Sequence, residues 1–448
     1  MILHRILPLL LCWALAACAI APVQTAGTPA IRCTAAPQAW RLSLEPGASL
    51  PESLAAGLDA ELDRAYASAA LPGETARNRP VSRSMLLLSG GSEDGAFGAG
   101  FLSQWAALRK SGSLPRFRVV SGISTGSLQA SFAFIDEPQV NVDAYQIAKE
   151  ADLLHPLVSR GLDEHPVRGA LSLARRGTLA TLQPLREKLH GLLTPARLRA
   201  IAAESVPAPD GPGRLLLVGA VEMDSGDLLV FNLGKLAQNW VAATEQGDGE
   251  TARAWKNCYV EALLASSSVP MAAAPVFIDG KPFIDGGARF GVFLGPLDRA
   301  LARQATRDPS PANLFLLVNG TLKVAPQCLL APCAAAKTKW RFDALAFRSL
   351  SVLINQSYVA SVWWANAVGA GHGYAPRFAR MELGPQGFAE HRARSGLTPA
   401  EPEERTCPEW KAIDQARDHP LEFHPRFMRC LVDYGRSHPA VKDWAGLE

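Results

Sequence analysis

Two glycine-containing stretches decide the fold: Leu86-Leu87-Leu88-Ser89-Gly90-Gly91-Ser92-Glu93-Asp94-Gly95 and, about thirty residues later, Gly122-Ile123-Ser124-Thr125-Gly126. An apolar strand that runs into clustered glycines leaves bare backbone N–H groups where an anion can sit. A serine bracketed by glycines at the end of the next strand is held out of the chain as a nucleophile. Together the two stretches indicate covalent acyl chemistry.

The segments around these motifs predict an α/β fold. Residues 85–88 and 117–120 are short apolar runs without polar alternation, which is typical of strands buried on both faces of a parallel sheet. Each leads into a helix-compatible segment, at 95–110 and 124–134. We therefore expect a mostly parallel sheet covered by helices on both faces. Further strands are expected at 215–221, 228–231, 276–279, 282–284 and 314–318, and helices at 53–70, 252–265 and 340–368.

The composition is that of a loop-rich globular enzyme. The chain has 448 residues, of which 48% are hydrophobic, enough to build a sizeable core. Its 37 glycines and 33 prolines fit a loop-rich enzyme better than a helical bundle. A net charge of +3 with 19% charged residues indicates neither a nucleic-acid-binding protein nor an acidic tail.

The N-terminus resembles the signal of a bacterial lipoprotein. His4 and Arg5 precede an apolar stretch, Ile6 to Ala17, which is too short for a comfortable transmembrane helix and about right for a signal-peptide core. The stretch ends in Leu15-Ala16-Ala17-Cys18, which is similar to a lipobox. The resemblance implies cleavage before Cys18, acylation of its thiol by chains such as palmitate, and anchorage in the bacterial cell envelope, at the outer membrane facing the periplasm. An ordinary secretory signal is the alternative.

Cysteine usage agrees with export. After loss of Cys12 with the signal and acylation of Cys18, six cysteines remain, an even number such as a periplasmic disulfide set has. Spacing makes the local pairs Cys328–Cys333 and Cys407–Cys430 plausible, but the sequence does not fix the connectivity. The remaining two are Cys33 and Cys258. Since no Cys-x-x-Cys or histidine cluster accompanies them, no metal site is expected.

Each motif alone has an ordinary alternative. The serine motif could be a tight turn with a helix cap. The glycine loop could bind a nucleotide phosphate, but Ser92 interrupts the Gly-x-Gly-x-x-Gly pattern and two acids would repel phosphate, so an oxyanion is the better ligand. A third motif, Phe283-Ile284-Asp285-Gly286-Gly287, places a carboxylate after a strand, although Asp-Gly is also a common turn.

The three motifs in this order resemble the patatin-like phospholipase family. Its members have a glycine-rich oxyanion loop, a Gly-x-Ser-x-Gly elbow about thirty residues later, and an Asp-Gly-Ala/Gly motif further on. The resemblance covers about residues 84–320 and includes the segments 219–234 and 262–270. It implies a patatin-like three-layer α/β/α sandwich. The expected domains are a signal peptide at 1–17, a tether and N-terminal extension at 18–80, a catalytic domain at 81–325 and a mainly helical C-terminal region at 326–448.

The resemblance also assigns roles. Ser124 matches the nucleophile, Asp285 the proton acceptor, and the N–H groups of Gly90, Gly91 and Ser92 the oxyanion hole. The motif glycines are Gly122, Gly126, Gly286 and Gly287. Such a Ser–Asp dyad implies no metal or cofactor and no catalytic histidine. Seven histidines that a Ser-His-Asp hydrolase would have to draw on are expected to be surface or packing residues: His155, His165, His372, His391, His419, His424 and His438.

Two departures from the family pattern bear on the substrate. The family loop usually reads Gly-Gly-Gly-x-Arg/Lys-Gly, whereas Ser92 replaces the third glycine here and Asp94 the basic residue. A serine keeps the N–H if its φ angle suits a side chain, whereas an acid disfavours a lipid phosphate. The expected function is hydrolysis of carboxylic esters of lipids, with phospholipids less favoured than neutral esters and the oligomeric state open. The alternative is a catalytically silent lipoprotein that binds envelope lipid or a protein partner.

Overall fold

The structure is a computed structural model. It describes residues 31–42, 57–58, 60–63, 65, 82–157, 178–206, 213–294, 298–307, 312–323, 342–382, 384, 386–399 and 401–446. Several predictions fall outside these residues: the signal peptide at 1–17, Cys18, His165, the Cys328–Cys333 pair and most of the helix expected at 53–70.

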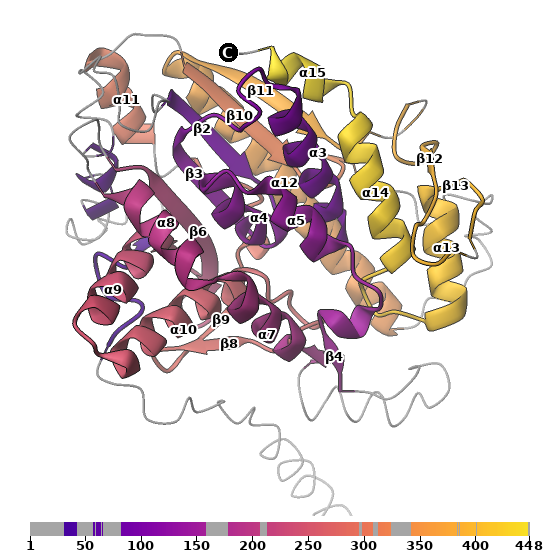
Figure 1. The fold of residues 1–448 in the computed structure, drawn as a ribbon, viewed down its shortest axis with the longest axis horizontal. Coiled ribbons are helices and arrows are strands. Elements are labelled where there is room, and N and C mark those ends of the chain that lie inside the picture. Colours follow the sequence, from indigo (N-terminus) through magenta and orange to yellow (C-terminus); the bar gives the residue numbers. More distant parts are fainter. Residues whose placement is uncertain are drawn as a thin grey trace, which may run out of the picture.

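A nine-stranded sheet lies at the centre of the described chain (Figure 1). Its strands are β1 (Ala39–Leu42), β2 (Ser82–Leu88), β3 (Phe117–Ile123), β6 (Leu215–Glu222), β7 (Leu228–Asn232), β8 (Val276–Ile278), β9 (Lys281–Asp285), β10 (Ala312–Val318) and β11 (Tyr374–Arg380). Five of them run parallel in the order β6-β3-β2-β10-β11, and β7 and β1 extend the β6 edge in antiparallel fashion. The predicted α/β fold with a mostly parallel sheet is confirmed.

Successive apolar residues of each central strand supply two separate cores. In β2, Leu86 and Leu88 pack into one cluster, whereas Met85 and Leu87 pack into the other. Side chains alternate between the faces of a strand, so a continuous apolar run requires cover on both sides. Burying each such leucine stabilises the fold by about 1.5–3 kcal/mol. The two cores make the molecule the expected three-layer sandwich.

Most helices cover the Leu86 face of the sheet, and two cover the Met85 face. On the first face lie α3 (Gly95–Leu108), α4 (Thr125–Phe134), α5 (Pro138–Tyr145), α7 (Gln183–Leu192), α8 (Pro195–Ser205), α9 (Leu233–Glu245), α10 (Gly249–Ser266), α13 (Cys407–Asp418), α14 (Pro425–Ser437) and α15 (Ala440–Ala445). On the second lie α11 (Asp298–Arg307) and α12 (Phe342–Gly371). The helices predicted at 95–110, 124–134, 252–265 and 340–368 are therefore present.

Segments outside residues 81–325 take part in the same sheet. Strand β1 pairs with β7, and β11 pairs with β10 from Ala312↔Tyr374 onward. A disulfide between Cys33 and Cys258 ties the β1 segment to α10. A second disulfide, Cys407–Cys430, joins α13 to α14 and confirms the local pair expected from spacing.

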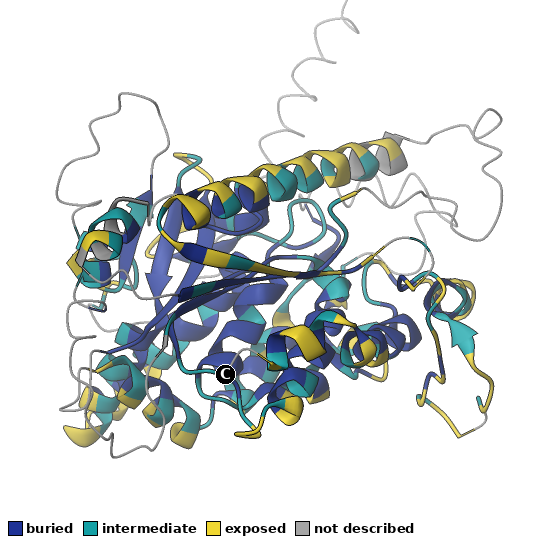
Figure 2. Cartoon of the chain, turned by 90° about the horizontal axis from the view of Figure 1, so that it is seen from above, coloured by how far each residue is buried: buried dark blue, intermediate teal, exposed yellow. Residues whose placement is uncertain are grey.

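Helix α12 lies along one face of the sheet and exposes apolar side chains on its outer side (Figure 2). Its inner side buries Val362, Ala365 and Val368 against the sheet, whereas Trp363 is 67% exposed and Trp364 40%. Within the described ranges, none of the helices combines the length and the apolar character needed to cross a membrane.

Candidate active site

Two strands meet end to end on one edge of β6. Strand β3 runs parallel to the first half of β6 and places Ile123 opposite Gly219, whereas β9 runs antiparallel to the second half and places Asp285 opposite Ala220. Strand β7 occupies the other edge of β6, so β3 and β9 share this one. Because Ser124 follows Ile123 and Asp285 is the last residue of β9, the register brings the two side chains together.

The backbone at Ser124 forms a sharp elbow between β3 and α4. Ser124 has φ 53° and ψ −125°, a conformation that is rare for a residue with a side chain and costs about 1–3 kcal/mol. A methyl group at Gly122 would overlap the carbonyl of Gly126, and one at Gly126 would overlap the carbonyl of Leu88. The two motif glycines are therefore needed because the elbow packs against backbone on both sides.

Hydrogen bonds fix the main chain of the elbow. The Ser124 N–H donates to the Ser266 Oγ at 2.9 Å, and the Ser266 hydroxyl donates in turn to the Gly219 carbonyl at 2.7 Å. The Ser127 hydroxyl donates to the Ser124 carbonyl at 2.6 Å. Ser266 was not predicted as a site residue, although it lies in the 262–270 segment that resembles the family.

Asp285 is a buried base candidate with few polar contacts. Its Oδ1 accepts a hydrogen bond from the Gly287 N–H at 2.6 Å. Burial raises the pKa of Asp285 to about 7, although the nearby Ser124 hydroxyl and the Gly287 N–H favour its ionised form, and the negative charge of Glu422 adds to the rise. A carboxylate that gains a proton near neutral pH is well matched to general-base work.

The turn after Asp285 needs its glycines for space. A methyl group at Gly286 would overlap the carbonyl of Gly219, and one at Gly287 would lie 2.9 Å from the Asp285 Oδ1. The absence of side chains at both positions therefore lets the turn and its carboxylate lie close to the neighbouring strand β6.

The predicted oxyanion loop lies directly against Ser124, the predicted nucleophile. A methyl group at Gly90 would lie 3.0 Å from the Ser124 Cβ. Gly91 has φ 155°, and a methyl group there would overlap the Asn319 carbonyl. Within the described residues, the N–H groups of Gly90 and Gly91 donate no hydrogen bond, which leaves them for a ligand oxygen. Ser92 takes φ 52°, so the serine in the third glycine position adopts a left-handed backbone.

Residues of the C-terminal region hold this loop. The Ser92 hydroxyl donates to the Glu422 carboxylate. Glu93 binds Lys411 Nζ at 2.6 Å through Oε1, and through Oε2 it binds both the backbone N–H of His424 at 3.0 Å and its ring Nδ1 at 2.8 Å. We call these contacts, made by Ser92 and Glu93 with Lys411, Glu422 and His424, the loop clamp. Nothing in the local sequence marks its C-terminal members.

The clamp also sets the charge of the loop. Burial opposes ionisation of Glu93, but the charge of Lys411 and the contacts of His424 outweigh it and lower the pKa of Glu93 to about 2. Burial and the charge of Glu93 raise the pKa of Asp94 to about 7, and burial raises the pKa of Glu422 to about 7. Lys411 of α13 thus supplies beside the loop the cation that the loop itself lacks at Asp94.

The histidines that the structure describes lie away from the dyad: none of them hydrogen-bonds to Ser124 or Asp285. His424 contacts Glu93, and His391 contacts Asp433 at 2.9 Å. Over the same described residues, His, Cys, Asp and Glu form no group of three that could hold a metal ion.

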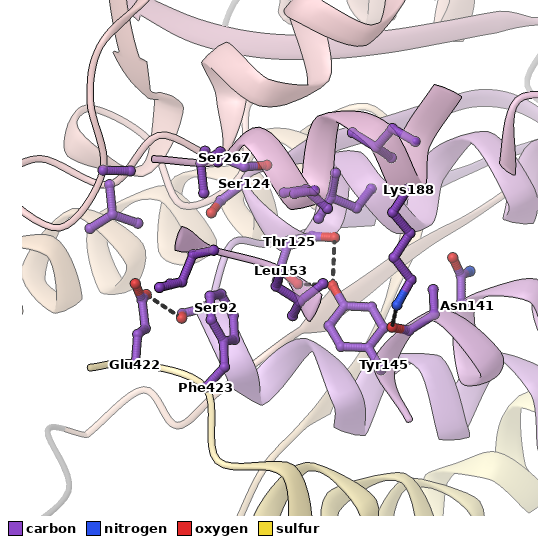
Figure 3. A pocket seen from close by; sticks show the side chains of 18 of the residues that line it. Ser92, Ser124, Thr125, Asn141, Tyr145, Leu153, Lys188, Ser267, Glu422 and Phe423 are labelled. Carbon is purple, nitrogen blue, oxygen red and sulfur yellow. Dashed lines mark hydrogen bonds between the residues drawn. The ribbon is translucent and has the colours of Figure 1, made fainter. Parts of the chain in front are cut away.

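A largely apolar pocket opens beside Ser124 (Figure 3). It encloses about 820 Å³, part of it open to solvent. Its apolar lining includes Leu128, Phe132, Leu153, Leu154, Leu185 and Leu189. Lys188 also lines it, with its Nζ turned to the Ala144 carbonyl at 2.7 Å. Such a lining suits an acyl chain better than a charged ligand.

The chain is similar to one known family and to several solved structures. Residues 86–298 match the model of the patatin-like phospholipases. One of the solved structures is VipD from Legionella pneumophila, with 11% sequence identity and a TM-score of 0.24; the match covers 55% of this chain and 52% of VipD, so the chain spans about half of that protein. No curated protein matches the chain. Residues 86–298 therefore form a patatin-like phospholipase domain, which confirms the family resemblance drawn from the motifs.

Proposed function

We propose that the protein is a serine acyl hydrolase that cleaves carboxylic ester bonds of lipids through Ser124 and Asp285. The family match supports lipid acyl hydrolysis at the level of the family. The observation that carries the proposal is the strand register that brings the elbow residue Ser124 beside Asp285, a buried carboxylate whose pKa is raised to about 7. Free loop N–H groups and an apolar pocket lie beside that serine.

In this mechanism Ser124 Oγ attacks the ester carbonyl while Asp285 accepts its proton. The N–H groups of Gly90 and Gly91 stabilise the oxyanion of the tetrahedral intermediate. The C–O bond to the alcohol then breaks, and Asp285 returns the proton to the departing oxygen. Water, activated by the same carboxylate, hydrolyses the acyl-enzyme.

The surroundings of the loop favour an uncharged ester. Glu93 is ionised, and Asp94 and Glu422 have pKa values of about 7, so at neutral pH the loop region carries negative charge beside the cation of Lys411. A phosphate head group would meet repulsion there. We propose neutral acyl esters as better substrates than phospholipids.

We propose further that the enzyme works in the bacterial cell envelope, anchored through acylated Cys18. The lipobox-like Leu15-Ala16-Ala17-Cys18 supports this location. The disulfides Cys33–Cys258 and Cys407–Cys430 support it as well, because disulfides persist in oxidising compartments. Radiolabelled palmitate should label the wild type in cells and leave Cys18→Ala unlabelled; equal labelling of both would exclude this anchor.

A fluorophosphonate probe tests the central proposal, because it reacts with activated serines. The wild type should be labelled and Ser124→Ala should not. Ser111→Ala, which makes the same change at an exposed serine away from the elbow, serves as the matched control and should still be labelled. Equal labelling of wild type and Ser124→Ala would exclude Ser124 as the nucleophile, and a wild type without label or ester turnover would favour the silent lipoprotein.

A further inference from the structure

The inner face of α12 places a tyrosine hydroxyl over the dyad. A methyl group at Gly90 would overlap the Tyr358 Oη, and one at Gly287 would lie 2.8 Å from that oxygen and 2.9 Å from the Asp285 Oδ1. The hydroxyl therefore lies between the oxyanion loop and the turn that carries the base. Helix α12 lies outside residues 86–298, so this group comes from beyond the matched domain.

The surrounding residues are shaped to admit this side chain. The φ angle of Gly90 is not positive, so the loop needs a glycine there for space and not for conformation. A methyl group at Gly291 would lie 2.6 Å from the Tyr358 Cα. The Gly291 N–H donates to the Ser361 Oγ at 3.1 Å, which fixes α12 one turn beyond the tyrosine.

The Tyr358 hydroxyl is available as a donor. It makes no hydrogen bond to any residue that the structure describes. Burial, together with the negative charges of Asp285 and Asp94, raises the pKa of Tyr358 well above its usual value, so the phenol keeps its proton. A neutral phenol therefore lies beside Asp285, the group that returns the proton to the substrate in the proposed mechanism.

We propose that the Tyr358 hydroxyl donates a hydrogen bond to the leaving oxygen of the ester, a role that rests on the proposed function. In the acylation step the Ser124 Oγ–carbon bond is formed and the carbon–oxygen bond to the alcohol breaks. Asp285 delivers the proton taken from Ser124 to the departing oxygen. Tyr358 keeps its own proton and stabilises the negative charge that develops on that oxygen.

This role predicts a dependence on the leaving group. An alkoxide leaving from an alkyl ester of a lipid alcohol develops much negative charge and needs a donor, whereas p-nitrophenolate is stable without one. Tyr358→Phe removes only the hydroxyl and keeps the ring. We expect kcat/KM, which reports acylation, to fall about 10²-fold for ethyl butyrate and less than about threefold for p-nitrophenyl butyrate.

The control is Tyr374→Phe, which makes the same change on β11 at the amino end of the parallel strands, the end of the sheet opposite the dyad. It should change neither rate. Fluorophosphonate labelling of Ser124 in Tyr358→Phe, at the wild-type rate, checks that the variant site is folded.

Equal losses on both esters would overturn the leaving-group role, since an oxyanion donor or a packing defect lowers both rates alike. An unchanged rate on ethyl butyrate would overturn it as well. In both of these cases Ser124 is still labelled and the proposed function stands, whereas a wild type that is unlabelled and hydrolyses neither ester would overturn both proposals.

Discussion

Residues 86–298 and the residues after 342 build the same site by different means. In the first region the register of β3 and β9 on β6 brings Ser124 and Asp285 together. The second region adds neither nucleophile nor base. Its side chains instead hold the oxyanion loop, raise the pKa of the base through Glu422 and place a phenol above it. The comparison shows that strand register positions the two dyad residues. Side-chain contacts from distant parts of the sequence set the support of the loop and the pKa of Asp285.

The largest loss of activity should come from a change in the first region, residues 86–298. Asp285→Asn keeps the size of the side chain but removes the base, so ester turnover should fall about 10⁴-fold. The control is Asp433→Asn, whose side chain is 56% exposed and pairs with His391. Ester hydrolysis by the two purified variants decides the matter, and an Asp285→Asn enzyme with near wild-type turnover would exclude the dyad.

Breaking the loop clamp should cost less activity but more stability. Glu93→Gln removes the carboxylate that contacts the buried His424 and the half-exposed Lys411, which should lower the free energy of unfolding by about 2 kcal/mol. Turnover should fall about tenfold because the oxyanion loop loses its support. Urea denaturation and ester hydrolysis measure both effects.

The stability contributed by Glu93 should depend on pH. The pKa of Glu93 is lowered from 4.5 to about 2 in the fold, so its stabilisation is fully present above about pH 4.5 and lost as the pH falls toward 2. The stability difference between wild type and Glu93→Gln should therefore shrink over that window. Glu403→Gln, at a side chain that is 66% exposed, is the control and should show no such difference. A gap that is constant with pH would contradict the clamp.

Glu422 tests whether the C-terminal region acts on the base, because its negative charge adds to the rise in the pKa of Asp285. As the pH rises, kcat/KM of the wild type should increase through about pH 7, when Asp285 loses its proton. Asp94 and Glu422 titrate in the same range, so this rise of kcat/KM with pH, the acid limb of the profile, reports the three carboxyl groups together. Glu422→Gln removes a negative charge near Asp285 and should move the limb to lower pH. A limb that stays in place or rises would show that Glu422 does not act on the base, and Glu382→Gln is the matched surface control.

The smallest effect concerns the backbone of Ser92. Ser92→Ala and Ser92→Gly both lose the hydrogen bond to Glu422, but only glycine relieves the left-handed φ of 52°. The glycine variant should therefore be more stable than the alanine variant by about 1 kcal/mol. Urea denaturation of the pair measures this, and equal stabilities would mean that the loop relaxes away from this conformation.

The sequence predicted the parts of the fold whose signals are local. Apolar runs such as 85–88 and 215–221 and the three glycine motifs led to the strands, the elbow and the residues that meet at Asp285. Strand β11 was missed because Pro376, Arg377 and Arg380 interrupt its apolar residues, so that they form no continuous apolar run. Tyr358, Lys411 and Glu422 were missed for another reason: their importance comes from contacts across hundreds of residues, which no local pattern records.

The loop clamp joins residues that are synthesised at very different times. Glu93 and His424 are 331 positions apart in the chain. At a synthesis rate of about 5–20 residues per second, roughly 20 to 60 seconds separate the emergence of the oxyanion loop from that of the residues that hold it. From the synthesis of Ser124 until that of Lys411, the nascent chain carries the serine but lacks Lys411, Glu422 and His424. For the proposed hydrolase, the oxyanion loop therefore gains its side-chain support only when nearly the whole chain has been made.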